Sequence, residues 1–316
     1  MAIVPPVSLS HLASDLSEAG HQRLWYWRGW RIRYWFHQGA AVTTDQPPLL
    51  FIHGFGANLN QWRHNLPALS QRFPVYALDL LGFGDAEKAA TLYGAELWAS
   101  QVADFIEAVV GTPVVLVGHS LGALVALTVT HRHPAGVKQL VLITVPLSAD
   151  REDLVAGWVS NLALKVESLV STPVLMRPLF RIVRRPGFLR WALKGIYAAT
   201  PDRVDDELLN LFVLPPGERG AARTLCYLVR SRTEPDFSPS VKTMMAALSV
   251  PTLLLWGAKD RVIPPAPAAD LASLSPAVTL KILPAVGHCL YDEAWEVFNP
   301  LLITWVNCGA PEIEGG

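Results

Sequence analysis

The sequence predicts an α/β fold in which a mostly parallel, doubly wound sheet of about eight strands is covered by helices. Two observations carry this prediction. Short apolar runs rich in valine, leucine and isoleucine alternate with segments of helical periodicity along most of the chain, as in right-handed βαβ units. The alternation stops between about residues 146 and 250, where helical periodicity and prolines replace buried strands. We therefore expect a doubly wound core with a helical insertion.

The first predicted element is an aromatic hairpin. WYWRGWRIRYWFHQG, residues 25–39, contains two strand-like runs with Arg28-Gly29 near the turn. Further runs have the length and the apolar composition of strands that are buried on both faces. These runs are PPLLFIHG, FPVYALDL, TPVVLVGHS, VKQLVLITV, VPTLLLWGAKD and VTLKILPAVGH.

Segments with helical periodicity lie between and after these runs. They are LNQWRHNLPALSQR (59–72), AELWASQVADFIEAVV (95–110), LGALVALTVTHRH (121–133) and DEAWEVFNPLLITWVN (292–307). Residues 1–145 and 251–316 are predicted to form the two parts of the core, and residues 146–250 a helical cap. Because ligands of such sheets bind outside the carboxyl ends of the strands, we expect the cap to cover that edge.

Composition narrows the class of protein. Of the 316 residues, 51% are hydrophobic and 17% are charged, with a formal net charge of -1. These values indicate a folded chain and argue against a nucleic-acid partner. The cysteines, Cys226, Cys289 and Cys308, form no CxxC pair, so we expect neither a disulfide framework nor a zinc site. We also expect no signal peptide and no transmembrane helix, which together predict a cytoplasmic protein.

One serine lies between two glycines where a predicted strand meets a predicted helix. In VVLVGHSLGALVALTV, residues 114–129, a strand-like run precedes Ser120 and a helix-like run follows it. A turn in a buried segment also favours glycine and serine, so Gly118 and Gly122 alone do not identify a site. In this strand–turn–helix context, however, G-x-S-x-G is typical of a nucleophile held on a strained turn.

A serine hydroxyl needs a base to become a nucleophile, and the base needs an orienting carboxylate. His288 follows the last predicted strand, and Asp260 follows the strand before it. The alternatives are a structural histidine and a carboxylate that caps the following turn, with Asp150 as the alternative acid. The chain order Ser120, Asp260, His288 is that of a known type of triad. Since all three residues follow predicted strands, we predict that they form a catalytic triad.

A second loop completes the predicted site. His53-Gly54-Phe55-Gly56 follows the first long buried strand. The backbone N–H groups of Phe55 and Leu121 are expected to form an oxyanion hole. No metal and no organic cofactor are expected, because this chemistry requires none. The residues expected around the substrate are His53, Gly54, Trp62 and His119, although His53 is better explained as a brace for its own turn.

Together, these motifs resemble the α/β-hydrolase superfamily from about Trp25 to Trp305. DLLGFG, beginning at Asp79, is similar to the superfamily's D-x-x-G-x-G-x-S turn, with Ala86 where serine is usual. The resemblance implies the α/β-hydrolase fold. It also argues against the epoxide hydrolases and haloalkane dehalogenases of the superfamily, which use an aspartate nucleophile where this chain has Ser120. Cofactor-free lyases, perhydrolases and hormone receptors share the scaffold.

A narrower resemblance is to the pheophytinase and chlorophyll dephytylase group and its cyanobacterial relatives. VGHCLYDEAWEVFNPLL is similar to the GHCPHDE segment of that group, with Leu290 and Tyr291 in place of Pro-His. HGFGANLNQWRHN and RRPGFLRWALKGIY are also similar to stretches of the group. The resemblance implies a small-molecule, apolar ester as substrate, namely the phytyl ester of a chlorophyll-type pigment. A carboxylesterase or lipase for other lipid esters, and a non-enzymatic receptor, stay open as alternatives.

The predicted cap contains a basic and apolar stretch. From Arg177 to Lys194, RPLFRIVRRPGFLRWALK has six basic residues and no acidic one. One interpretation is a lid helix over the active site with solvated arginines. A second, compatible interpretation is peripheral contact of the cap with an anionic membrane, which the narrower resemblance would make a thylakoid membrane. The sequence contains no signal for an oligomeric state.

Overall fold

The computed structural model describes residues 19–43, 45–147, 185–197, 199–213, 220–232 and 237–308, together with Leu16. Each strand in this part of the chain overlaps a run that the sequence predicts as a strand. The strands are β1 (His21–Trp27), β2 (Trp30–His37), β3 (Leu49–Ile52), β4 (Val75–Leu78), β5 (Val114–His119), β6 (Val137–Ile143), β7 (Thr252–Gly257) and β8 (Val278–Leu283).

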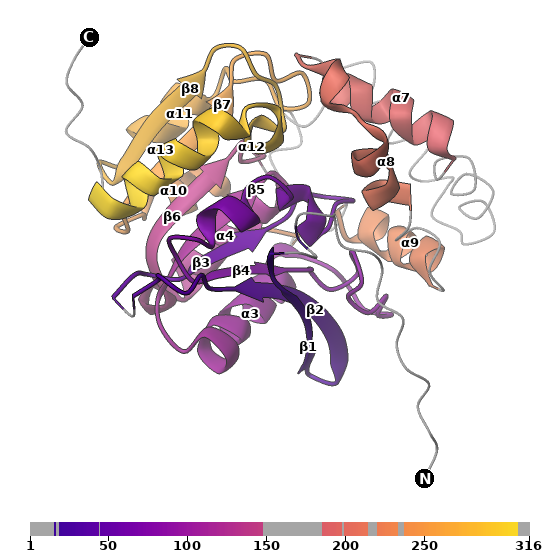
Figure 1. The fold of residues 1–316 in the computed structure, drawn as a ribbon, viewed down its shortest axis with the longest axis horizontal. Coiled ribbons are helices and arrows are strands. Elements are labelled where there is room, and N and C mark those ends of the chain that lie inside the picture. The colour runs from indigo at the N-terminus through magenta and orange to yellow at the C-terminus, as the bar shows by residue number, and fades with distance from the viewer. Residues whose placement is uncertain are drawn as a thin grey trace.

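The strands of the described residues form one eight-stranded sheet in the order β1-β2-β4-β3-β5-β6-β7-β8 (Figure 1). From β4 to β8 every neighbouring pair is parallel, whereas β2 is antiparallel to both of its neighbours. Arg28 and Gly29 connect β1 and β2 with φ of 50° and 85°, the positive values that a type I′ hairpin turn requires. The predicted hairpin and the predicted mostly parallel sheet are confirmed.

Helices cover both faces of this sheet (Figure 1). Strand β5 is buried on both sides: Val114 and Leu116 belong to one apolar cluster, and Val115 and Val117 to the other. Helices α3 (Ala95–Phe105), α4 (Leu121–Arg132), α10 (Val241–Ala246) and α11 (Ala268–Ser273) contribute to the first cluster. Helices α2 (Leu66–Leu69), α12 (Leu290–Glu293) and α13 (Trp295–Cys308) contribute to the second.

The helix predicted over residues 59–72 is wrong in its length. The chain forms a 3-10 turn, η1 (Leu59–Trp62), and then the short helix α2. Pro67 lies at the second position of α2, where a missing N–H costs nothing, whereas inside a continuous helix its ring would clash with the preceding turn. The short helix α11 between β7 and β8 was not predicted.

Between β6 and β7 the described residues form helices and no strand. Helices α7 (Pro186–Ile196), α8 (Asp206–Val213) and α9 (Ala221–Arg232) lie together at one side of the core in Figure 1, and α10 leads into β7. The cap boundaries at 146 and 250 stay a prediction. Asp150 and the basic residues from Arg177 to Arg184 lie outside the described residues. No helix in the described ranges combines the length and apolarity needed to cross a membrane.

The junction of β5 and α4 depends on two glycines that leave no room for a side chain. A Cβ atom on Gly118 would lie 2.2 Å from the carbonyl oxygen of Gly122. A Cβ atom on Gly122 would lie 2.3 Å from the carbonyl oxygen of Ile52, in β3. Backbone atoms cannot move aside as a flexible side chain can, so α4 packs against β3 and β5 only with glycine at these positions.

We expect Gly122→Ala to lower the free energy of unfolding by about 3 kcal/mol or more, because the added methyl group overlaps backbone atoms. Urea denaturation of the purified protein measures this change. The control is Gly195→Ala, since a Cβ atom at Gly195 in α7 meets nothing within 4 Å. The control should be unchanged or stabilised by less than about 1 kcal/mol. Equal stability of both variants would contradict the packing argument.

Candidate active site

The two loops that the sequence predicts at the active site follow adjacent strands. Ile52, the last residue of β3, pairs with Gly118 of β5. From β3 the chain continues to β4 on one side, while β5 lies on the other side. Strand order therefore reverses here, and doubly wound sheets bind ligands at such a point. Phe55 and Leu121 both follow this pair closely, so their loops leave the same carboxyl edge of the sheet.

Ser120 occupies a strained turn between β5 and α4. Its backbone has φ 53° and ψ -117°, a conformation that costs a non-glycine residue about 1–3 kcal/mol. The Ser120 N–H donates to the carbonyl oxygen of Ile143, in β6, at 2.9 Å. This bond and the close packing of the flanking glycines maintain the strain. The side chain of Ser120 is left half-buried at the edge of the sheet.

Asp260 and His288 lie together in the structure. Asp260 Oδ2 is 2.8 Å from His288 Nδ1, and both side chains are buried. The other carboxylate oxygen of Asp260 accepts from the N–H groups of Val262 and Ile263 at 2.8 and 2.9 Å. One carboxylate therefore caps its own turn with one oxygen and holds the histidine with the other. Both roles considered for Asp260 are present.

The second ring nitrogen of His288 is free to act as a base. Within the described part of the chain, His288 Nε2 makes no hydrogen bond, and none joins it to the hydroxyl of Ser120. Hydrogen bonds between catalytic groups are often long without substrate and tighten only in the complex. The geometry thus supplies an oriented imidazole whose outer nitrogen is unoccupied.

His119 connects the Ser120 turn to the His288 loop. Its Nε2 donates to the carbonyl oxygen of His288 at 3.1 Å, and the centroids of the two rings are 4.7 Å apart. Burial, together with the neighbouring His288, holds the pKa of His119 well below its usual range. The ring is therefore neutral, and its Nδ1 has no partner among the described residues. A Cβ atom on Gly54 would lie 2.9 Å from this nitrogen.

His53 and Trp62, which the sequence predicts around the substrate, lie directly after β3 and in η1. Both are completely buried. His53 Nε2 accepts from the Leu80 N–H at 3.1 Å, its Nδ1 donates to the Gly54 carbonyl oxygen at 2.8 Å, and burial lowers its pKa. Trp62 packs against Phe51 and Tyr291. These two side chains brace the loop after β3, and their contact with a substrate stays a prediction.

The predicted oxyanion donors are unpaired. Neither the Phe55 N–H nor the Leu121 N–H makes a hydrogen bond to another described residue. Leu121 is the first residue of α4, where backbone N–H groups have no partner within the helix. The neighbouring Gly54 N–H, in contrast, donates to Gln61 Oε1 at 3.1 Å. Two free donors thus remain on the loops that flank Ser120.

Glu293 holds the backbone on both sides of His288. Its carboxylate accepts from the N–H groups of Gly287 and Cys289, each at 3.0 Å. The hydroxyl of Thr200, which precedes α8, donates to the same carboxylate at 2.9 Å. No role for Glu293 was predicted from the sequence. Its sequence signal is the acidic pair Asp292-Glu293 at the end of the GHCLYDE segment.

The other member of that acidic pair, Asp292, connects the same loop to the cap. Its carboxylate accepts from Tyr197 Oη at 2.9 Å and from the buried Arg63 at 3.2 Å. Arg63 also contacts Asp205 and Glu207 at the start of α8. Burial opposes the charge of Arg63, but the carboxylates outweigh it and raise its pKa. No group of histidine, cysteine, aspartate or glutamate side chains within the described ranges could hold a metal ion.

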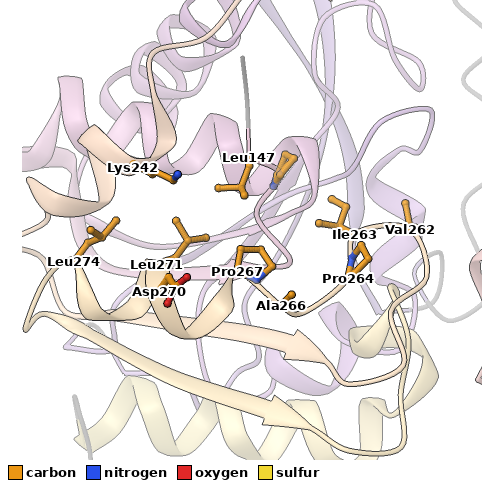
Figure 2. A pocket seen from close by; sticks show the side chains of 11 residues that line it. Leu147, Lys242, Val262, Ile263, Pro264, Ala266, Pro267, Asp270, Leu271 and Leu274 are labelled. Carbon is orange, nitrogen blue, oxygen red and sulfur yellow. The ribbon is translucent and has the colours of Figure 1, made fainter. Parts of the chain in front are cut away.

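A cavity of about 530 Å³ has none of Ser120, Asp260 and His288 in its lining, but two of its lining segments have a link to them (Figure 2). One segment, Pro146 and Leu147, follows Ile143, whose carbonyl oxygen binds the Ser120 N–H. The other, Val262 and Ile263, binds the Asp260 carboxylate. The remaining lining residues are Lys242, Pro264, Ala266, Pro267, Asp270, Leu271 and Leu274. The lining is therefore apolar except for one cation and one anion.

The comparisons with known proteins agree with this architecture. The family model described as alpha/beta hydrolase fold matches residues 47–294, so the chain belongs to the α/β-hydrolase family. Epoxide hydrolase 3 of Xenopus tropicalis is 28% identical over 276 residues, which cover 84% of this chain and 73% of that protein. A crystal structure of a bacterial membrane phospholipase A has a TM-score of 0.74 at 24% identity and covers 93% of this chain and 88% of its own.

The narrower resemblance has a distant counterpart among these relatives. Chloroplastic pheophytinase of Arabidopsis thaliana is 22% identical over 316 aligned positions, which cover 87% of this chain and 64% of that protein. The comparisons therefore confirm the superfamily and its fold, while the relation to pheophytinase stays remote.

We expect Glu293→Ala to loosen the His288 loop and to expose the thiol of Cys289, which is buried and whose pKa burial raises. Each hydrogen bond to a charged group contributes about 1.5–3 kcal/mol, so local opening should become at least about tenfold easier. The measurement is the rate at which Cys289 reacts with a thiol reagent, in a Cys308→Ser background that removes the exposed thiol.

Controls separate this local effect from general destabilisation. Glu296→Ala removes an exposed carboxylate that pairs with Arg203 and should leave Cys289 protected. Glu293→Gln keeps one acceptor oxygen and should give an intermediate rate. Cys226, buried in α9, is the internal reference. If Glu293→Ala makes Cys226 and Cys289 react faster by the same factor, the His288 loop has no special dependence on Glu293.

Proposed function

We propose that this chain is a serine hydrolase that cleaves a carboxylic ester of a bulky apolar substrate through an acyl-enzyme. The hydrogen bond of 2.8 Å between His288 and Asp260 carries the proposal, because it orients a base whose outer nitrogen is unoccupied. Ser120 holds a half-buried hydroxyl on a strained turn directly after β5. The unpaired N–H groups of Phe55 and Leu121 add the donors that ester cleavage requires.

In the acylation step, Ser120 Oγ attacks the ester carbonyl carbon while His288 Nε2 takes the hydroxyl proton. The carbonyl oxygen becomes an anion that accepts from the N–H groups of Phe55 and Leu121. Collapse of this intermediate breaks the bond to the alcohol, and His288 returns the proton to the leaving oxygen. Asp260 stays ionised throughout and holds the His288 tautomer.

Deacylation repeats the same chemistry with water. His288 Nε2 takes a proton from a water molecule as its oxygen attacks the acyl carbon. The oxyanion forms again between the same donors, and its collapse releases the acid and returns the proton to Ser120 Oγ. No step needs a metal or an organic cofactor.

We assign the large apolar group of the ester to the apolar cavity, whose lining residues Val262 and Ile263 bind the Asp260 carboxylate. The cavity volume of about 530 Å³ lies within the range typical of small-molecule sites. We further propose the phytyl ester of chlorophyll or pheophytin as the substrate. The GHCLYDE segment and the distant similarity to pheophytinase support this choice. A cytoplasmic location with peripheral thylakoid contact is part of the same proposal.

Other functions of the scaffold are less well supported. Epoxide hydrolysis would require an aspartate nucleophile, and position 120 is a serine. A non-enzymatic receptor would need neither the strained Ser120 turn nor free oxyanion donors. A carboxylesterase or lipase acting on other lipid esters uses the same groups and differs only in substrate. An assay of purified protein against p-nitrophenyl esters, chlorophyll a and pheophytin a, with free alcohol as the readout, tests these functions together.

We expect Ser120→Ala to lower turnover of p-nitrophenyl acetate by roughly four to six orders of magnitude without loss of the fold. The wild-type protein should show a burst of one alcohol per active site, because the acyl-enzyme accumulates. Ser100→Ala is the matched control, since the Ser100 hydroxyl only bonds a carbonyl within α3. Near-normal turnover in folded Ser120→Ala protein would show that this serine is not the nucleophile.

We expect Leu147→Trp to fill part of the cavity and to reduce the preference for long-chain over acetyl esters roughly tenfold. The quantity to measure is the ratio of kcat/KM for p-nitrophenyl palmitate and p-nitrophenyl acetate. Val297→Trp adds the same ring at an exposed position of α13 and should leave the ratio unchanged. An unchanged ratio in Leu147→Trp would place the substrate chain elsewhere.

A further inference from the structure

Helix α7 presents two aromatic rings between two cations on its exposed side. Arg185, Phe188, Trp191 and Lys194 follow each other at three-residue spacing and are all exposed. Such residues form one oblique row along a helix surface, which we call the α7 row. Trp191 is 72% exposed and Phe188 37%, and their ring centroids are 5.6 Å apart. The rings thus form a joint apolar patch open to solvent.

The side of α7 opposite the α7 row packs against the second apolar cluster. Leu193 and Tyr197 are buried in the second apolar cluster, and Leu189 and Ile196 pack against it. The aromatic rings of the α7 row are therefore not needed to hold the helix in place. Figure 1 shows α7 at the outer rim of the molecule, with α8 beside it.

The positive charge of the α7 row is not neutralised by neighbouring residues. Arg185 and Lys194 form no ion pair within the described part of the chain. The acids at the start of α8 are engaged elsewhere: Asp206 pairs with Arg190, while Asp205 and Glu207 pair with Arg63. The row therefore keeps two available cations beside its rings.

We propose that the α7 row docks the protein on an anionic lipid surface. Tryptophan favours the boundary between headgroups and acyl chains, and an amphipathic helix lying in that plane can bury its rings there. Arg185 lies about one helical turn before Phe188, and Lys194 lies about one turn after Trp191. Both cations can therefore meet anionic headgroups beside the buried rings. Docking does not require the proposed esterase activity. If that activity holds, docking would bring the cap to a membrane-dissolved ester.

Vesicle flotation of the full-length chain tests the charges. We expect binding to vesicles of phosphatidylcholine with phosphatidylglycerol at low salt, and little binding at high salt or to phosphatidylcholine alone. Arg185→Gln with Lys194→Gln should weaken binding about 25-fold, from roughly fivefold for each cation. Lys138→Gln with Lys281→Gln makes the same change of charge at exposed positions outside the cap and should bind like the parent.

The aromatic rings are tested separately. Phe188→Ser with Trp191→Ser should weaken binding roughly tenfold or more, whereas Tyr26→Ser, at a residue that is 63% exposed, should not. Trp191 is the one tryptophan among the exposed large apolar side chains of the described residues. Its emission should shift to shorter wavelength on binding. Trp191→Phe should keep the binding and lose this shift.

Several outcomes would overturn the proposal. These are absent binding to phosphatidylglycerol vesicles at low salt, binding unaffected by the α7 row variants, and equal binding to neutral vesicles. If the aromatic variant instead changes the sedimentation of the protein alone, the row is an interface with a second copy. Ser120→Ala should bind vesicles like the parent, so failure of the esterase proposal and failure of this one remain distinguishable.

Discussion

The buried carboxylate of Asp79 connects β2 to the loop after β3, which contains Phe55. Its Oδ2 accepts from Arg33 Nε at 2.6 Å and from the Asp85 N–H at 2.8 Å, and its Oδ1 accepts from the Leu59 N–H at 2.8 Å. Burial opposes ionisation, but Arg33 and His53 outweigh it and lower the pKa of Asp79. Arg33 also pairs with the buried Asp85 at 2.9 Å, so removing Arg33 would leave two buried carboxylates without their cation, at a cost of about 3–5 kcal/mol. The loop after β3 therefore depends on a contact between Arg33 in β2 and Asp79, the residue after β4.

The remaining groups of the site are held in the same way, by bonds between distant segments. Packing against β3 maintains the strained turn at Ser120, and the carboxylate of Glu293 holds the peptide groups around His288. Asp292 connects that loop to Arg63 and to Tyr197 of the cap. The geometry of the candidate site is a property of the assembled sheet edge, since no single loop contains enough contacts to maintain it.

Most features that depend on neighbouring residues in the chain were predicted correctly, whereas several that depend on distant contacts were not. The strands were predicted well because strands buried on both faces are continuous apolar runs. The helix over 59–72 was wrong because its periodicity hid the effect of Pro67, and α11 was too short to show a period. His53 and Trp62 were placed around the substrate by their position in the chain, and the structure adds that both side chains are completely buried. Glu293 was missed because two of its partners are backbone N–H groups. Every residue except proline carries such a group, so the sequence does not mark the partners.

The sequence by itself determined the succession of strands and helices along the chain. It also determined the loops in which Ser120, Asp260 and His288 lie. These features follow from local patterns of apolar residues and glycines. Only the tertiary structure decided that Asp260 meets His288 and that Phe188 and Trp191 face outward. It also decided that Glu293 binds the His288 loop and Thr200, and that Asp292 binds Arg63 and Tyr197. Such contacts join segments that are far apart in the chain. Arg63 and Asp292, for example, are 229 residues apart. These contacts depend on how the sheet brings those segments together, which no local pattern encodes.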